Sequence, residues 1–218
     1  MPNTPQRLPQ TLLLGFGLLL GLLALAYLVS LTQLNRLHNE KILPPLGKIA
    51  DFTLTNQDGK NITLADLTNH VWVADIIFTR CASSCPIMSS QMKSLQAALP
   101  SDSPAKLVTL TCDPSYDTPP ILEKYGQRYD ADFHRWMFLT GTPKELSNLA
   151  TGSLKFGVTP VSPQQRNAPT DFFVHSTIFV VVGKHAQLRG IFQTEGQDVN
   201  WTKIKPQILA VVKQLEGE

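Results

Sequence analysis

Two cysteines spaced four residues apart carry the most specific chemistry in the sequence. Cys81 and Cys85 lie in the segment TRCASSCP, directly after the apolar run of residues 71–78. Such a run predicts a buried central strand, and Pro86 suits the first turn of a helix that follows it. If that turn is helical, the two side chains stack on one helix face, about 5–6 Å apart at their Cβ atoms. This spacing permits either a disulfide or a shared metal ion.

The place of the pair at the start of a helix favours the thiolate form. Free N–H groups and the helix dipole lower the pKa of a thiol at that end. A thiolate is both a ligand for soft metals and a nucleophile. The same two residues therefore support metal binding or thiol–disulfide exchange.

Two thiolates make an incomplete metal site, and imidazole is the natural third ligand. The candidate histidines are His38, His70, His134, His175 and His185. His175 lies between a long loop and a β-rich run, where the loop can carry it to the cysteines. A site of two cysteines and one histidine suits Cu(I), tolerates Cu(II) and is also accepted by zinc. The residues alone leave the histidine and the metal open.

Other residues near these motifs have simpler explanations. Cys112 ends a predicted strand and reads as a small buried apolar residue. Met88 and Met92 share the helix face of the cysteine pair, and methionines in such positions are usually core. Asp113 and Asp117 either cap turns or orient the site from outside.

Composition limits the classes of function. The chain has 218 residues, and Arg7 is the only charged residue among the first 35. The remainder is close to neutral, with 18 Lys and Arg against 17 Asp and Glu. Because nucleic-acid binding needs a basic excess, nucleic acid is excluded as the main partner. Three cysteines are too few for a disulfide scaffold.

The N-terminal segment predicts one membrane span. We expect a short tail over residues 1–11, a transmembrane anchor over 12–32 and a stalk over 33–47. A single domain then occupies residues 48–218. The alternative is a cleaved signal peptide, since Ala24-Leu25-Ala26 has the form of a cleavage site. The apolar run continues past that site, which favours the anchor.

Alternation of strand and helix patterns predicts an α/β domain. Strands are expected at 71–78, 106–111 and 136–139, hairpins at 52–64 and 176–193, helices at 85–99, 118–129 and 142–154, a loop at 157–173, and a last helix from near Pro206 to about Leu215. This order fits a thioredoxin-like fold with an added N-terminal β-hairpin.

Three segments together resemble the Sco/SenC family of copper-binding, thioredoxin-fold proteins. They are TRCASSCP, DPSYDTP at residues 113–119, and His175 within VHST. The resemblance spans about residues 45–215, and the single N-terminal anchor fits it too. CxxxC alone is moderately specific. The combination is highly specific: CxxxC follows a buried strand, DPxxDTP lies further along the chain, and a histidine precedes the last hairpin.

The resemblance implies a metallochaperone. One copper ion, as Cu(I) or Cu(II), would bind through Cys81, Cys85 and His175 and serve assembly of the CuA centre of cytochrome c oxidase. The expected partners are a copper-accepting oxidase subunit, a copper donor and a thiol reductase, because a disulfide cannot hold copper. The rim around the pair, including the loop at 158–173, is where we expect the oxidase subunit to dock.

The same chemistry places the domain outside the cytoplasm. We predict a single-pass protein of the bacterial inner membrane whose C-terminal domain faces the periplasm. The basic residues around the anchor, counted alone, favour the opposite side: Arg7 precedes it, and Arg36, Lys41 and Lys48 follow. Because so few charges flank the anchor, the chemistry of the cysteine site is the better guide to which side of the membrane the domain faces.

The alternative class is an enzyme, a thiol–disulfide oxidoreductase in which Cys81 and Cys85 keep partner cysteines reduced. Such reductases have CxxC rather than CxxxC, and a proline before the last hairpin. His175 stands about where that proline would be, which disfavours the enzyme. A copper or redox sensor would use the same site with a signalling partner.

Overall fold

The chain divides into an N-terminal unit and a domain that runs from Pro44 to Glu218. The structure is a computed structural model that describes residues 10–39, 44–166, 170 and 172–218. Within the first helix, side chains are described for Leu14–Leu31.

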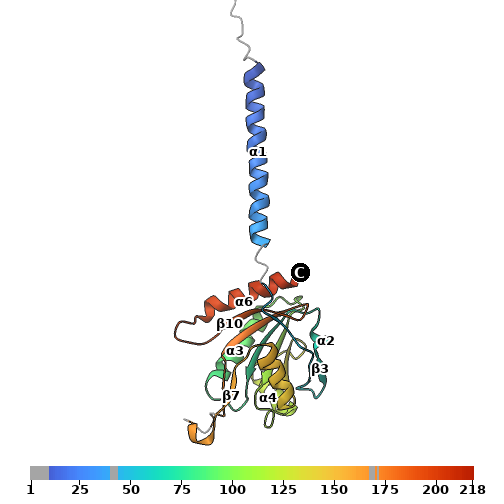
Figure 1. Cartoon of the computed structure of the whole chain (residues 1–218), viewed down its shortest axis with the longest axis vertical. Helices are drawn as coiled ribbons and strands as arrows, with labels where there is room; N and C mark the ends of the chain where they lie inside the picture. The colour runs from blue at the N-terminus through green and yellow to red at the C-terminus, as the bar shows by residue number, and fades with distance from the viewer. Residues whose placement is uncertain (1–9, 40–43, 167–169, 171) are drawn as a thin grey trace, which may run out of the picture. The chain divides into compact units, whose positions relative to one another are not determined.

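The described part of the N-terminal unit is the helix α1 (Gln10–Asn39), drawn in blue in Figure 1. Its segment Leu14–Leu31 is long and apolar enough to cross a membrane. The helix extends beyond the segment assigned to the anchor and into the predicted stalk. The helix continues there because no glycine or proline, the residues that disfavour a helix most, lies between Asn35 and Asn39. The residues at 40–43 lie outside the described part, so the division into tail, anchor and stalk stays a prediction.

The domain is built on one mixed sheet. Its elements are β1 (Gly47–Lys48), β2 (Thr53–Asn56), β3 (Asn61–Thr63), α2 (Leu64–Leu67), β4 (Trp72–Ile77), α3 (Ser84–Ala98), β5 (Lys106–Thr111), α4 (Pro119–Arg128), β6 (Trp136–Thr140), α5 (Pro143–Ser147), η1 (Asn148–Ser153), β7 (Val158–Pro160), η2 (Pro163–Gln165), β8 (Phe173–His175), β9 (Ile178–Gly183), β10 (Gln187–Gln193) and α6 (Trp201–Glu216). The sheet order is β1-β10-β9-β4-β5-β6-β2-β3. Strands β4, β5 and β6 are parallel, and the other pairs are antiparallel.

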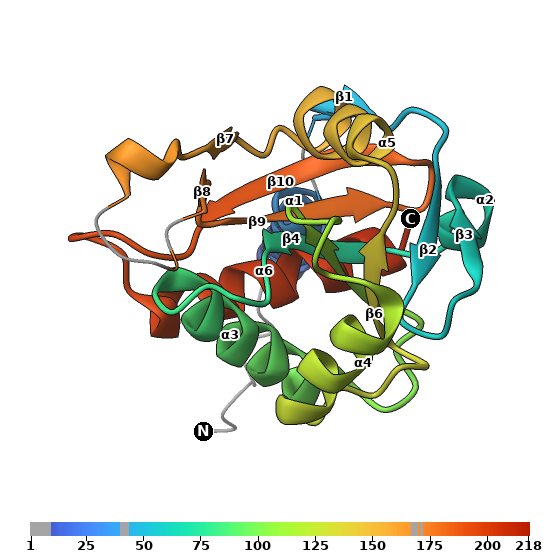
Figure 2. The same ribbon diagram turned by 90° about the horizontal axis from the view of Figure 1, so that it is seen from below.

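Both faces of the sheet are covered, which makes β4 a buried central strand. Alternate residues of β4 point to opposite layers. Val73 and Ile77 pack with residues of α3, α4 and α6. Trp72 and Ile76 pack with residues of α5 and η1. Figure 2 shows α3 and α6 on one side of the strands and α5 on the other.

This architecture confirms the predicted thioredoxin-like α/β fold with an added hairpin. The hairpin β2–β3 turns through Gly59, whose φ of 76° lies in the left-handed region that glycine adopts without strain. It joins the sheet through β2, which pairs with β6.

Two element predictions were wrong. The last helix begins at Trp201, five residues before Pro206. Asn200 caps it by accepting a hydrogen bond from the Thr202 backbone N–H at 2.9 Å. Pro206 is exposed, so the carbonyl that its missing N–H leaves free can be solvated.

The predicted loop at 157–173 is an arm with structure of its own. Its two ends form the short antiparallel pair β7–β8, and η2 lies between them. Strands of three residues are too short to show alternation in a sequence. The helix expected at 142–154 was right in extent, but its second half, η1, is a wider π-helix.

Candidate metal centre

The cysteine pair lies at the junction between the end of β4 and the start of α3. The Cys81 backbone N–H donates to the Phe78 carbonyl at 3.1 Å, which closes a tight turn at the strand end. Cys85 follows in the first turn of α3. Both are free thiols; Cys81 is half-buried and Cys85 is buried.

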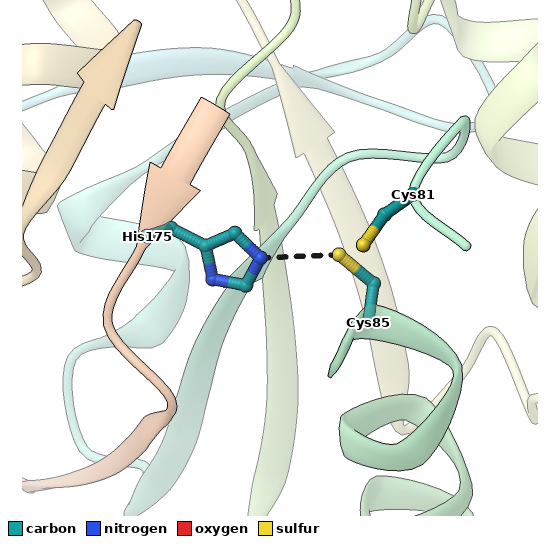
Figure 3. Close-up of side chains that lie close together, drawn as sticks. All are labelled: Cys81, Cys85 and His175. Atoms are coloured by element: carbon teal, nitrogen blue, oxygen red, sulfur yellow. Dashed lines mark hydrogen bonds between the residues drawn. The ribbon is translucent and has the colours of Figure 1, made fainter. Parts of the chain in front are cut away.

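His175 comes from the arm, at the end of β8. Its Nε2 atom lies 3.1 Å from the Cys85 sulfur, as Figure 3 shows. Its Nδ1 atom lies 3.2 Å from the Ser176 carbonyl, which can only accept a hydrogen bond. The ring proton therefore belongs on Nδ1, and the Nε2 lone pair faces the thiols.

These three residues form a compact donor set. The two sulfurs and one imidazole nitrogen all lie within 4.8 Å of one another. They are also the only group of three or more potential metal ligands among the described residues. Two sulfurs and one nitrogen at this separation fit a soft metal ion, which would bind after small side-chain adjustments.

The two thiols of the pair differ in acidity. The hydrogen bond from Cys85 is the main cause that lowers the pKa of Cys81 to about 3, and Ser83 and a protonated His175 act in the same direction. Burial raises the pKa of Cys85 far above its usual value. At neutral pH the site therefore holds a thiolate at Cys81 and a proton on Cys85.

Aromatic side chains enclose the imidazole. The ring centroid of Phe78 lies 5.9 Å from that of His175, with an interplanar angle of 89°. Phe173 packs edge-on against the same Phe78 ring at 5.5 Å. A cavity of about 270 Å³, lined by Cys81, His175 and Val161 among others, opens beside the donor set. This cavity gives an ion or a partner side chain access to the site.

Arg80, directly before Cys81, links the cysteine turn to two other segments. Its guanidinium lies 4.2 Å from the ring centroid of Tyr116 and 3.9 Å from that of Phe172. Its Nε atom donates to Asp113 at 3.1 Å. The Arg80 side chain thus joins the cysteine turn, the loop after β5 and the arm that carries His175.

The buried side chain of Asp117 holds the loop after β5 in place through hydrogen bonds. It accepts hydrogen bonds from the Thr79 backbone N–H at 3.1 Å and from the Thr111 hydroxyl at 2.5 Å. Burial raises its pKa, and these hydrogen bonds oppose that shift. Asp113 and Asp117 therefore do more than cap turns, because each contacts the residues just before the cysteine pair.

The remaining candidates stay outside the donor set. Cys112 is half-buried against both core layers, and Met88 and Met92 are fully buried in the core, as expected. His70 Nδ1 lies 3.0 Å from the Pro104 carbonyl, away from the cysteines. The histidines at 134 and 185 are not part of the group either, and the His38 side chain lies outside the described residues.

Arg80 and the phenylalanines of the arm are contacts of the site that were not predicted from the sequence. A basic residue beside a reactive cysteine is a usable signal, and Arg80 has it. No local pattern marks Phe172 as its partner, because the two are 92 positions apart in the chain.

Comparisons with known proteins agree on one family. The family model of SCO1/SenC matches residues 44–208. The SCO1 protein homolog of Bacillus subtilis is 32% identical over 167 residues, which are 73% of this chain and 83% of that protein.

Solved structures share the fold. The structure of BsSco, described as a member of the Sco family of cytochrome c oxidase assembly proteins with a disulfide switch, is 30% identical with a TM-score of 0.64; the match covers 79% of this chain and 95% of that one. The structure of Bradyrhizobium japonicum ScoI with copper bound is 19% identical with a TM-score of 0.63, covering 77% and 99%. From the family match and the shared fold we conclude that this chain belongs to the SCO1/SenC family.

Proposed function

We propose that the protein is a membrane-anchored copper metallochaperone. It binds one copper ion through Cys81, Cys85 and His175 and assists assembly of the CuA centre of cytochrome c oxidase. The observation that carries this proposal is the donor set: two sulfurs and an imidazole nitrogen within 4.8 Å, with the nitrogen lone pair turned toward the sulfurs. The copper bound by ScoI and the oxidase-assembly role of BsSco support it.

The chain's own residues prepare the site for exchange of the ion. Cys81 is half-exposed and already a thiolate, so it is the first ligand to meet an incoming ion. Cys85 loses its proton on binding, because only the thiolate is a strong ligand. Since every ligand must be deprotonated, acid releases the metal. A Cys81–Cys85 disulfide excludes it.

The same reasoning gives the partners and the location. The copper ion leaves by ligand exchange to an oxidase subunit that offers soft ligands, and we place that contact on the rim formed by the arm at 158–173. A copper donor and a thiol reductase precede this step. Residues 12–32 anchor the chain in the bacterial inner membrane, with residues 48–218 in the periplasm. The near-neutral domain has no role in binding nucleic acid.

Oxidase assembly in cells tests the chaperone role. In a strain that lacks the gene, we expect oxidase to lose its CuA absorption and the wild-type gene to restore it. Cys81→Ser should fail to restore it, whereas Cys112→Ser, a change outside the donor set, should succeed. Restoration by Cys81→Ser at equal protein level would contradict the proposal.

A second candidate is thiol–disulfide oxidoreductase activity. The low pKa of Cys81 beside a buried second thiol favours it, because a thiolate attacks disulfides. The variant His175→Ala distinguishes the two proposed functions. That change should weaken copper delivery strongly, while a reductase that needs only the cysteines would retain most of its rate with a dithiol-specific substrate.

A further inference from the structure

One buried carboxyl in the domain takes no part in the donor set. Asp75 lies in the middle of β4 and is the only charged residue of that strand. Its side chain is fully buried, and neither carboxyl oxygen has a hydrogen-bond partner. Burying a carboxyl without partners is costly, so such a group calls for an explanation in function or in packing.

Asp75 points into the same layer as the cysteine pair. It alternates with Val73 and Ile77, which belong to the core layer that contains Cys85. Its register neighbour on β5 is Thr109. The Thr109 hydroxyl oxygen accepts the indole N–H of Trp136 at 2.9 Å. Its own O–H is left to point toward Asp75, where it lowers the pKa of the carboxyl without completing a hydrogen bond of normal geometry.

Few titratable groups face Asp75 from the elements packed around it. Cys85 of α3 and Tyr125 of α4 belong to this layer, and Cys81, Cys112 and Tyr129 pack against it, while β5, β9 and α6 present uncharged residues to it. His175 of β8 also acts on Asp75 through its charge when it is protonated. Burial raises the pKa of Asp75 to about 7; the Thr109 hydroxyl and, to a smaller extent, the charge of a protonated His175 act against that shift. The carboxyl therefore lies within electrostatic reach of a residue of the donor set, and its pKa is close to neutral pH.

We propose that Asp75 is a proton acceptor coupled to the metal centre, which binds a proton when the centre gains negative charge and releases it when that charge is lost. The inference rests on the proposed copper function. Cu(II) with two thiolates and a neutral imidazole sums to zero charge. Cu(I) with the same ligands carries one negative charge.

The coupled step balances one electron with one proton. On reduction by an external one-electron donor such as dithionite, the electron goes to copper and a proton from solvent forms an O–H bond on Asp75. No bond to a ligand residue breaks. Oxidation reverses both transfers. The carboxyl thus keeps the total charge of the buried region constant in the two copper states.

Glu195 provides the matched control. It also feels the charge of the centre: burial raises its pKa, attraction to His175 lowers it, and repulsion from Cys81 raises it. Its Oε1 atom is buried without a hydrogen-bond partner, but the residue as a whole is only half-buried, so solvent screens its charge better than that of Asp75. A proton coupled to the copper state should therefore bind to Asp75 and not to Glu195.

The test measures the copper potential and the carboxyl together, in full-length protein solubilised in detergent. Between the carboxyl midpoints of the Cu(II) and Cu(I) forms, the wild-type potential should fall by up to about 59 mV per pH unit, a tenfold change in proton concentration for one electron. Asp75→Asn and Asp75→Val should flatten this slope, and Glu195→Gln should keep it. A slope that survives both Asp75 variants, or one removed by Glu195→Gln alone, overturns the proposal.

Infrared spectroscopy of the wild-type protein gives a readout that needs no variant to fold. With carboxyl-labelled aspartate, the band of a buried protonated carboxyl should titrate near neutral pH. Its midpoint should lie lower in the Cu(II) form than in the Cu(I) form. Equal midpoints in the two forms overturn the proposal.

The failure of copper binding is distinguishable from the failure of this inference. If the protein takes up no copper, the proposed function fails, and the metal-free protein still tests Asp75. The reduced pair carries the Cys81 thiolate and the disulfide carries no charge. The carboxyl midpoint should therefore be lower in the oxidised protein, and equal midpoints there also contradict a proton-coupled role.

Discussion

At the scale of single residues, the three cysteines differ in how readily each loses its proton. The pKa of Cys81 is lowered to about 3, chiefly by its hydrogen bond with Cys85. Burial raises the pKa of Cys85 and of Cys112. One cysteine is therefore a nucleophile at neutral pH, and the other two keep their protons.

This difference predicts the order of alkylation. In the reduced, metal-free protein at pH 6, iodoacetamide should modify Cys81 at least tenfold faster than Cys85 or Cys112, because only Cys81 is a thiolate there. Mass spectrometry of peptides after short exposure measures the order. Unfolding in urea should remove the difference. Equal rates for the three residues in the folded protein would contradict the assigned pKa shifts.

Asp75 predicts a pH-dependent stability. Its pKa rises from 3.8 to about 7 on folding, so the native state binds the proton more tightly than the unfolded chain. This contribution is fully present below pH 4 and is lost as the pH rises through 7. Between pH 5 and pH 8 the wild type should lose about 3 kcal/mol from this residue.

Urea unfolding of the wild type and Asp75→Asn at both pH values measures this loss. The difference in free energy of unfolding between the two proteins should move in favour of the variant as the pH rises. A difference that stays constant between pH 5 and pH 8 would show that the buried carboxyl does not titrate in this range.

At the scale of elements, the arm β7–β8 decides whether the site is complete, because it carries His175. Arg80 holds the arm to the cysteine turn through the Phe172 ring at 3.9 Å. Residues that orient a metal ligand typically contribute 10–100-fold to affinity.

We therefore expect Arg80→Ala to weaken copper binding about 10–100-fold while the stoichiometry stays the same. Phe172→Leu should act in the same direction. Arg128→Ala is the control, since its guanidinium packs on the Tyr125 ring at 4.7 Å, away from the donor set. Competition titrations with a copper chelator provide the affinities. An affinity of Arg80→Ala equal to that of Arg128→Ala would show that the arm needs no such tether.

The elements also show what a sequence can predict here. The strand β4, the helix α3 and the cysteine pair between them follow from local patterns: an apolar run, a proline in the first turn, and a four-residue spacing. The choice of His175 came from the family resemblance, because the residues alone left five histidines open. Nothing local shows that β7 and β8 form a paired arm or that Phe172 packs on Arg80, since both depend on contacts between distant residues.

Asp75 could be predicted from the sequence only in part. A charged residue inside VWVADIIF is visible in the sequence as an exception in a buried strand. Its full burial and its lack of hydrogen-bond partners depend on the packing of two other layers, which only the structure gives.

At the scale of the whole molecule, the domain Pro44–Glu218 has its own core and forms a separate unit from the N-terminal helix. A chain lacking residues 1–43 should therefore fold, stay in solution without detergent and bind copper as the full chain does. The full chain should fractionate with membranes and resist extraction by high salt, because α1 has a segment long and apolar enough to cross a membrane. Calorimetry and fractionation check the two outcomes. A truncated chain that does not fold, or a full chain that is washed off by salt, would contradict this division.

The most direct test of the central claim is anaerobic titration of the reduced domain with Cu(I) and Cu(II). The account predicts one tightly bound copper ion per chain, with sulfur-to-copper charge transfer in the Cu(II) form. Cys81→Ser should abolish that binding, and His175→Ala should weaken it. His70→Ala, a histidine outside the donor set, should leave it unchanged. No tight copper binding by a folded domain, or binding unaffected by Cys81→Ser and His175→Ala, would contradict the account.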